Sequence, residues 1–445
     1  MMKQTAIALV LALSMTSPLF AQDKPPGTHT LRECITSSLQ RSPAVLSAEK
    51  EVERTNGVIW ETWSSIVSVD ISADYTEAEP GGTTTFLNNR QGFTIDLEGS
   101  VGIFSGGRVI NGVLTAYLSR DLAREQYRRA VNETVYNVTT SFGRILLDRE
   151  LVKVRSEETD FLTKTYDSTK TQYDTGMASW FQLLRTQVEL GNAQPSLMEA
   201  RDSLAGNMEG LKRILGMDVG DPFDIEGELS YRENTLDLDG CLNKAMMQNP
   251  DILIASLQEE IAKKAVRSVI GQYFPTVSIF GRYEYANDQL DVSFNDDDWD
   301  YLAGVTVTIP ITDLISISAR LKQARARYDQ ARITRTDVLN GIKAEVTAAF
   351  RDLVRSGKLV RSQKENVALA KEGLEIAEIQ YENGINTYLE LMDTRLALTQ
   401  ANLNYLNAVF SYMEAAARLE MLMGESPRVL DTPSDTGPDG GGPSQ

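Results

Sequence analysis

Few side chains in this sequence are of the types that carry out catalysis. His29 is the single histidine among 445 residues, and it lies close to the N-terminus. Histidine is the usual general base and a frequent zinc ligand, so Ser-His-Asp catalysis, His-zinc sites and HExxH motifs are almost excluded. The sequence also contains no Gly-x-Ser-x-Gly, P-loop or Cys-x-x-Cys pattern. We therefore expect no enzyme, no catalytic residue, no metal site and no cofactor.

Carboxylates, in contrast, are abundant. Acidic residues outnumber basic ones by 62 to 44, which gives a formal net charge of −18 and argues against a surface that binds nucleic acid. If the apolar faces of the predicted strands meet lipid, the polar faces would line an aqueous lumen, where carboxylates favour cations. A solvated polar face without selectivity is the alternative. The candidate lumen residues are Asp70, Asp74, Asp96, Glu98 and Glu284.

Alternation of apolar and polar residues predicts the strands that would carry these acids. Val67, Val69 and Ile71 alternate with Ser68 and Asp70, and three other segments repeat this period of two. Each segment has about ten residues, which is enough to cross a bilayer as a tilted strand. A soluble antiparallel sheet is the alternative. Four strands cannot close a barrel, so either helices cover them or several chains share one barrel. The predicted strands are about 66–78, 92–103, 276–286 and 300–310.

The chain repeats itself once, with an offset of 207 or 208 residues. Leu31 and Pro43 recur as Leu238 and Pro250, and a Gln-Tyr-acid-polar-Gly turn ends at both Gly176 and Gly384. Such a long period excludes a solenoid and indicates two copies of one unit. The predicted divisions are a signal peptide 1–21, repeat 1 at 22–216, a linker 217–237, repeat 2 at 238–424 and a disordered tail 425–445.

Long helices follow the strands of each repeat. Apolar and small residues step by three or four from Leu321 through Tyr328 to Leu353, which is typical of a coiled-coil seam. A first long helix of 66 residues would measure about 100 Å, and its partner after the Gly turn is shorter. We therefore expect helix 44–64 to stack on the end of this partner, which gives a rod with the turns at one end. The predicted helices after the strands are 107–172, 178–214, 314–380 and 386–423.

Export signals define the compartment. The signal peptide predicts an exported protein. No later run of about 20 apolar residues could span a bilayer as a helix, so a membrane protein of this sequence would be a β-barrel.

Cys34 and Cys241 could pair in an oxidising compartment. They occupy equivalent points of the two repeats, and we expect two buried thiols instead of a disulfide.

Taken together, these features resemble the TolC family of bacterial outer-membrane efflux proteins over residues 31–424. The resemblance lies in the repeated Leu…Pro segments, Phe104-Ser105-Gly106-Gly107-Arg108, Phe274-Pro275-Thr276-Val277 and the two Tyr-x-x-Gly turns. Each motif is weak alone, but the order, repeated behind a signal peptide, is specific. The resemblance implies a mixed fold. In this fold a long coiled-coil α-helical barrel joins a transmembrane β-barrel shared by a trimer, with two structural repeats and four strands per chain.

The same resemblance implies a passive channel-tunnel of a tripartite efflux or type I secretion system. It would sit in the bacterial outer membrane, extend into the periplasm and open at its periplasmic tip. The implied partners are the lipid bilayer, two further copies in a homotrimer, a periplasmic adaptor and an inner-membrane pump of the RND, ABC or MFS type. An envelope coiled-coil protein without a pore is the alternative, but it has no need for four strands of membrane-spanning length. The tip turns, which would also dock the adaptor, contain Tyr173, Gly176, Tyr381 and Gly384.

Residues at the entrance are also implied by the resemblance. Glu390 and Asp393 are three apart and share a helix face, where the family places an acidic constriction. The best-known members have an Arg two residues after the second Gly, tied to an acid near the first turn. Here Asn386 and Gln182 stand at those positions, which predicts a neutral contact pair and an entrance closed without an ion-pair lock.

Overall fold

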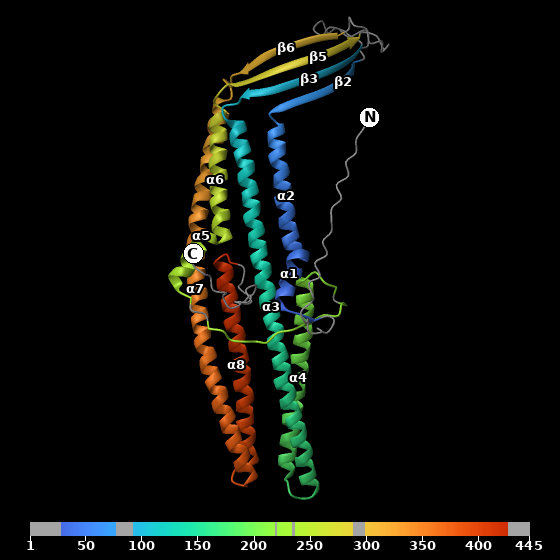
Figure 1. Cartoon of the computed structure of the whole chain (residues 1–445), viewed down its shortest axis with the longest axis vertical. Helices are drawn as coiled ribbons and strands as arrows, with labels where there is room; N and C mark the ends of the chain where they lie inside the picture. Colours follow the sequence, from blue (N-terminus) through green and yellow to red (C-terminus); the bar gives the residue numbers. More distant parts are fainter. Residues whose placement is uncertain (1–27, 77–91, 219, 234–235, 288–298, 426–445) are drawn as a thin grey trace, which may run out of the picture.

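The computed structural model describes residues 28–76, 92–218, 220–233, 236–287 and 299–425 (Figure 1). The molecule is a long rod in which the helices run roughly along the longest axis. A sheet lies at one end and two helical hairpin turns lie at the other (Figure 1). The signal peptide and nearly all of the predicted tail fall outside the described residues. Within the described residues, no helix is long and apolar enough to cross a membrane.

Each half of the chain has the same order of elements: two helices, two strands and two longer helices. The first half contains α1 (Leu31–Arg41), α2 (Pro43–Ser64), β2 (Val67–Thr76), β3 (Gly92–Phe104), α3 (Arg108–Asp174) and α4 (Trp180–Ile214). The second half contains α5 (Leu238–Gln248), α6 (Pro250–Gly271), β5 (Thr276–Asn287), β6 (Trp299–Thr308), α7 (Leu314–Glu382) and α8 (Tyr388–Leu422). The four strands of these halves and the helices α3, α4, α7 and α8 begin and end within two residues of the predicted positions.

Local chemistry explains several of these ends. Pro43 and Pro250 each occupy the first position of a helix, where the missing N–H costs no hydrogen bond. Asn249 caps α6 by accepting from the backbone N–H of Asp251 at 2.9 Å. In both halves a proline therefore starts the helix that follows the short one, and in the second half Asn249 adds a side-chain cap.

The four long strands form one antiparallel sheet in the order β2-β3-β5-β6. The central pairing, β3 with β5, joins the two halves of the chain, and β2 and β6 are the edge strands of the sheet within the described residues. The register of β3 on β5 shifts by one residue between Gly102 and Phe104, which is a β-bulge. Two short strands, β1 (Thr28–His29) and β4 (Asp224–Ile225), pair separately beside the rod.

Both faces of the sheet are exposed, although one of them is apolar. Its side chains include Ile71, which is 75% exposed, Val69, which is 69% exposed, and Val305, which is 63% exposed. No described helix packs extensively on the sheet, which projects beyond the rod in Figure 1.

Helix α3 is the centre of the rod. It packs against α1, α2 and α4 of its own half and against α6 and α8 of the other half. Along α3, the helices α2, α1 and α4 follow one another, as the lengths predict (Figure 1). Gly424, at the end of α8, has φ +75°, and a Cβ there would lie 2.4 Å from the backbone oxygen of Gln248. Only glycine permits this approach of α8 to α5.

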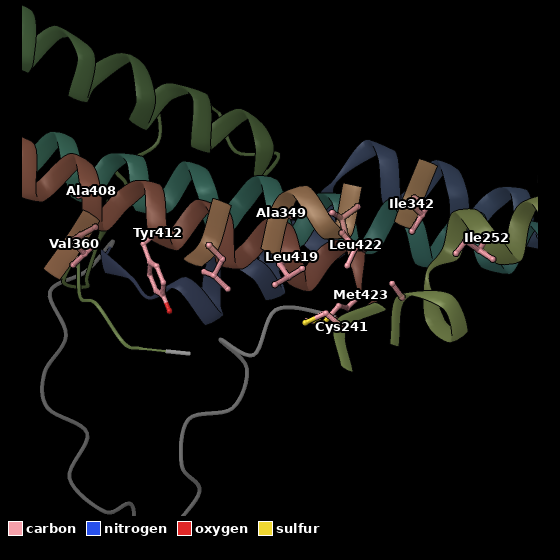
Figure 2. Close-up of a cluster of buried hydrophobic side chains, with 14 residues drawn as sticks. Cys241, Ile252, Ile342, Ala349, Val360, Ala408, Tyr412, Leu419, Leu422 and Met423 are labelled. Carbon is pink, nitrogen blue, oxygen red and sulfur yellow. The ribbon is translucent and has the colours of Figure 1, made fainter. Parts of the chain in front are cut away.

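Each half has its own hydrophobic core at the middle of the rod. In the first half, Cys34, Ile35 and Ile145 are buried between α1, α3 and α4. In the second half, Cys241, Leu419 and their neighbours pack between α5, α7 and α8 (Figure 2). The two cysteines are thus buried thiols in separate clusters, as expected from the sequence. Leu229, in the linker between the halves, packs against both clusters.

Candidate functional site

The two hairpin turns at the end of the rod have the same backbone structure. In the first turn, Gly176 has φ +77° and the N–H of Met177 donates to the oxygen of Gln172 at 2.7 Å. In the second turn, Gly384 has φ +70° and the N–H of Ile385 donates to the oxygen of Gln380 at 2.8 Å. This pattern satisfies the last carbonyls of α3 and α7 and needs a left-handed residue, which explains the two glycines.

An aromatic pair closes each turn. The rings of Tyr173 and Trp180 lie 5.7 Å apart, and those of Tyr381 and Tyr388 lie 6.3 Å apart. The second pair is more deeply placed, because Tyr388 packs beside Thr165 of α3. Burial raises the pKa of Tyr388 to about 12, so this hydroxyl stays neutral at physiological pH. Trp180, at the equivalent point of the first turn, is 58% exposed.

Glu390 takes part in a capping box at the start of α8. Its carboxylate accepts from the backbone N–H of Thr387 at 2.8 Å and from the hydroxyl of Thr387 at 3.0 Å. The Thr387 hydroxyl in turn accepts from the N–H of Glu390. The backbone hydrogen bond from Thr387 holds the pKa of Glu390 below its usual value. This carboxylate is therefore ionised and directed back to its own helix end.

Gln182 has the same role at the start of α4. Its side-chain oxygen accepts from the backbone N–H of Ser179 at 2.8 Å. The backbone N–H of Asn386 donates to the oxygen of Gln380 at 3.3 Å, within the second turn. Gln182 thus lies in a helix cap, and Asn386 lies in a turn. Among the described residues, no hydrogen bond joins these two side chains within one chain. A capping box is visible in the sequence as Ser-x-x-Gln and Thr-x-x-Glu.

Asp393 lies near a positive charge that sequence analysis missed. Arg185 of α4 forms an ion pair with Glu189 at 2.9 Å, and this hydrogen bond, together with the negative charge of Asp393, raises the pKa of Arg185. Arg185 and Asp393 occupy equivalent positions of the two repeats, 208 residues apart. Aligning the repeats places an arginine opposite an aspartate, but it does not predict that the two side chains lie near each other. Glu390 and Asp393 thus have different surroundings despite their shared face.

A groove runs between the two hairpins near the turns. It has a volume of about 350 Å³ and lies between α3, α4, α8 and the end of α7. Both polar and aromatic side chains line it, including Lys164, Thr165, Gln182, Tyr381 and Tyr388. Arg395 of α8 also stacks over the ring of Phe161 of α3 at 4.8 Å. The two hairpins are therefore in direct contact at the level of the turns.

The predicted lumen acids share one face of the sheet. The strand register places Asp70 beside Glu98, and Asp96 beside Glu284. Arg282 lies among them and donates to Glu98 at 2.9 Å. Asp300, the first residue of the predicted strand 300–310, was not among the predicted lumen acids, but it also lies on this face. The register places it beside Glu284, so Asp96, Glu284 and Asp300 form one row across three strands.

Comparison with known proteins identifies the family. A family model described as outer membrane efflux protein matches residues 34–217 and 241–425, which together make up most of the chain. The chain belongs to the outer membrane efflux protein family. This result confirms the resemblance seen in the sequence. Each of the two matched segments corresponds to one half of the chain as the fold divides it.

Relatives and solved structures agree with the family. The chain is 20% identical over 321 residues to the outer membrane protein TolC of Vibrio cholerae, covering 70% of this chain and 73% of that protein. It is 20% identical to the alkaline protease secretion protein AprF of Pseudomonas aeruginosa, covering 83% and 75%. The crystal structure of the Campylobacter jejuni CmeC outer membrane channel matches with a TM-score of 0.80 at 15% identity, covering 93% and 94%.

The function predicted from the sequence is confirmed at this level. This member of the outer membrane efflux protein family is a component of an efflux or secretion channel. It resides in the bacterial outer membrane. The family consists of transport channels, which agrees with the lack of catalytic motifs.

Proposed function

We propose that three copies of this chain form a passive conduit across the outer membrane and periplasm. The observation that carries the proposal is the four-stranded sheet with one exposed apolar face and two open edges. An apolar sheet face of this size needs a cover, and lipid is the cover that an outer-membrane location supplies. The opposite face, with its acids, would then line the lumen.

Closure of the barrel follows from the strand pairing within the chain. The pairing of β3 with β5 joins the first repeat to the second. The equivalent pairing from the second repeat to the first would join β6 of one copy to β2 of the next. Three copies then give twelve strands with no free edge, whereas four strands are too few to enclose a pore.

The helical part would continue the conduit into the periplasm. The rod places both hairpin turns at the end opposite the sheet (Figure 1), where an opening to the periplasm would lie. We propose that the turns containing Tyr173, Gly176, Tyr381 and Gly384 form the adaptor-docking tip, and that Glu390, Asp393, Gln182 and Asn386 lie at the constriction. An inner-membrane pump of the RND, ABC or MFS type would deliver cargo through the adaptor.

Conductance and assembly test the proposal together. The purified protein should migrate as a trimer in native mass spectrometry, fractionate with the outer membrane and form conducting pores in planar bilayers. A periplasmic monomer with no conductance would overturn the proposal and favour an envelope coiled-coil protein. A trimer in the outer membrane that never conducts, even with its tip turns deleted, would refute the conduit alone.

A further inference from the structure

Helix α4 contains a proline that its equivalent, α8, lacks. Pro195 lies inside α4, whereas Leu403 occupies the same position in α8. A proline has no backbone N–H, so the hydrogen bond that a regular helix would make to the carbonyl of Gly191 cannot form. The proline ring also crowds that carbonyl, and sharp bends of helices are found at such positions. The first hairpin therefore has a weak point that the second hairpin does not share.

Two neighbouring residues weaken the same turn of α4. Gly191 is a glycine inside a helix, and no described atom of the chain would lie within 4 Å of a Cβ there, so no contact within the chain requires a glycine. The hydroxyl of Ser196 donates to the carbonyl of Asn192 at 3.2 Å, a bond to the preceding turn that favours bending. In α8, Thr399 stands at the position of Gly191.

The two hairpins also differ in their own packing near the turns. In the second hairpin, Leu374 and Ala377 of α7 form a buried cluster with Leu391 of α8. In the first hairpin, Tyr166 and Thr169 stand at the positions of Leu374 and Ala377, and both are only half-buried. A segment with few buried apolar contacts opens at a lower free-energy cost than one with its own core. The second hairpin is thus the more rigid of the two.

Contacts between the hairpins are close above Pro195 and sparse at its level. Higher on the rod, the methyl group of Met413 on α8 leaves no room for a Cβ on Gly143 of α3. Near Pro195, one small cluster joins the hairpins, formed by Leu162 of α3, Ala193 of α4 and Met392 of α8. The hairpins are therefore held together above the weak point and can part below it.

The space between the hairpins beside Pro195 is incompletely filled. A cavity of about 240 Å³ lies against Ala193 and Ser196 of α4 and extends to Met392 of α8. Glu189 also lines it, and its Oε1 accepts from Arg185 at 2.9 Å. Among the described residues, Oε2 of Glu189 is buried without a hydrogen-bond partner. Parting the hairpins would hydrate this oxygen, which lowers the free-energy cost of opening.

We propose that the first hairpin bends at Pro195 and swings its turn away from the second hairpin, which keeps its shape. The bend widens the crevice between α4 and α8 and opens this end of the rod. Helix α3 can follow, because long helices curve without a break and Leu162 is its last buried residue. The inference rests on the conduit proposed above, and it adds which hairpin moves and where it bends.

Distances between spin labels test the position of the bend. One label is attached to a cysteine at Met177 in the first turn or at Ile385 in the second turn, and the other to a cysteine at Met247 on α5. All three side chains are exposed. Labelled chains should be a small minority in the assembled protein, so that distances within one chain are measured. The protein without added cysteines controls for reaction at the buried thiols Cys34 and Cys241.

The distances from Met177 should be more broadly distributed than those from Ile385. Pro195→Ala restores the hydrogen bond to Gly191, so it should narrow the first distribution to the width of the second and leave the second unchanged. Gly206→Ala in the same helix is the matched control, because a Cβ there would also meet nothing within 4 Å, and it should change neither distribution. Equal widths before substitution, or a broad first distribution that Pro195→Ala leaves unchanged, would overturn the hinge.

Conductance separates this inference from the proposed function. In planar bilayers, Pro195→Ala should lower the fraction of time for which the pore is open, without a change in the oligomeric state. A narrowed distance distribution with an unchanged open fraction would refute the role of the bend in opening. A protein that never conducts, but whose first distribution narrows in Pro195→Ala, would refute the conduit and leave the hinge standing.

Discussion

At the scale of residues, equivalent positions of the two repeats carry different chemistry on the same backbone. Gln182 and Glu390 accept the same hydrogen bond from the backbone of the capping residue, Ser179 or Thr387. One acceptor is neutral and the other is charged. Arg185 and Asp393 differ more strongly, since they have opposite charges. Duplication thus left the fold of each tip unchanged while its electrostatics diverged.

The charged cap makes one helix end sensitive to pH. The folded pKa of Glu390 lies below its ordinary value of 4.5, so its contribution to stability is present above pH 4.5 and is lost as the pH falls below it. The amides of residues 387–390 should therefore be less protected from hydrogen exchange in acid. This loss is measured after the observed rates are corrected for the change of the intrinsic exchange rate with pH. The variant Glu390→Gln should retain protection, because it copies the Gln182 cap. Equal acid sensitivity in both proteins would contradict this role.

The acid face of the sheet should control ion selectivity. Asp96→Asn/Glu284→Gln removes two carboxylates of the row across the sheet, and Arg282→Gln removes the base that donates to Glu98. In planar bilayers at low salt, where screening is weak, the first variant should lower the cation preference and the second should raise it. Reversal potentials in a salt gradient measure both. Identical reversal potentials in all three proteins would show that this face does not line the lumen.

At the scale of elements, the hairpin turns are the most constrained local structures. Gly384 has φ +70° and supports the hydrogen bonds that Ile385 and Asn386 donate to Gln380. A side chain in this conformation costs roughly 1–2 kcal/mol. The end of α7 and the start of α8 therefore depend on one glycine, and Gly176 has the same part in the first hairpin.

Substitution should reveal this strain. Gly384→Ala should speed hydrogen exchange at 385 and 386 by roughly 5–30 fold, which corresponds to the 1–2 kcal/mol of strain. The matched control is Gly57→Ala, inside α2, where a Cβ would meet nothing within 4 Å. That change should stabilise its helix by about 0.5–1 kcal/mol, because alanine is less flexible when unfolded. Slower exchange at the tip of Gly384→Ala would contradict the argument.

At the scale of the whole molecule, the linker contacts the hydrophobic cores of both halves, in addition to the packing of α3 on α6 and α8. Phe223 packs only on the first-repeat cluster, Leu236 packs only on the second-repeat cluster, and Leu229 packs on both. Arg149 of α3 also binds the linker, by donating to the backbone oxygen of Ile225 at 2.6 Å. The linker therefore couples the two halves of the rod mechanically.

Three alanine substitutions should separate these contacts. Leu229→Ala should weaken protection from hydrogen exchange in both α1 and α5, by about 1–2 kcal/mol for a half-buried leucine. Phe223→Ala should affect α1 alone, and Leu236→Ala should affect α5 alone. Mass spectrometry of the exchanged peptides measures all three. A Leu229→Ala effect restricted to one half would show that the linker does not couple the repeats.

The sequence alone determined the family, the elements and the equivalence of the two halves. The signals behind these predictions are local, so they can be recognised without knowledge of any long-range contact. They are the periods of two and of three or four residues, the prolines Pro43 and Pro250 at helix starts, and the glycines at both turns. The same signals placed the predicted lumen acids at alternate strand positions.

Only the tertiary structure decided which groups meet. The strand register added Asp300 to the acid face, and the packing of α8 on α3 brought Asp393 towards Arg185. It also showed that Leu184 and Leu369 are exposed where their equivalents are covered. Periodicity defines the faces of a helix or strand but not the neighbour that each face meets. That choice depends on the sizes and charges of residues far apart in the chain, such as Gly143 and Met413.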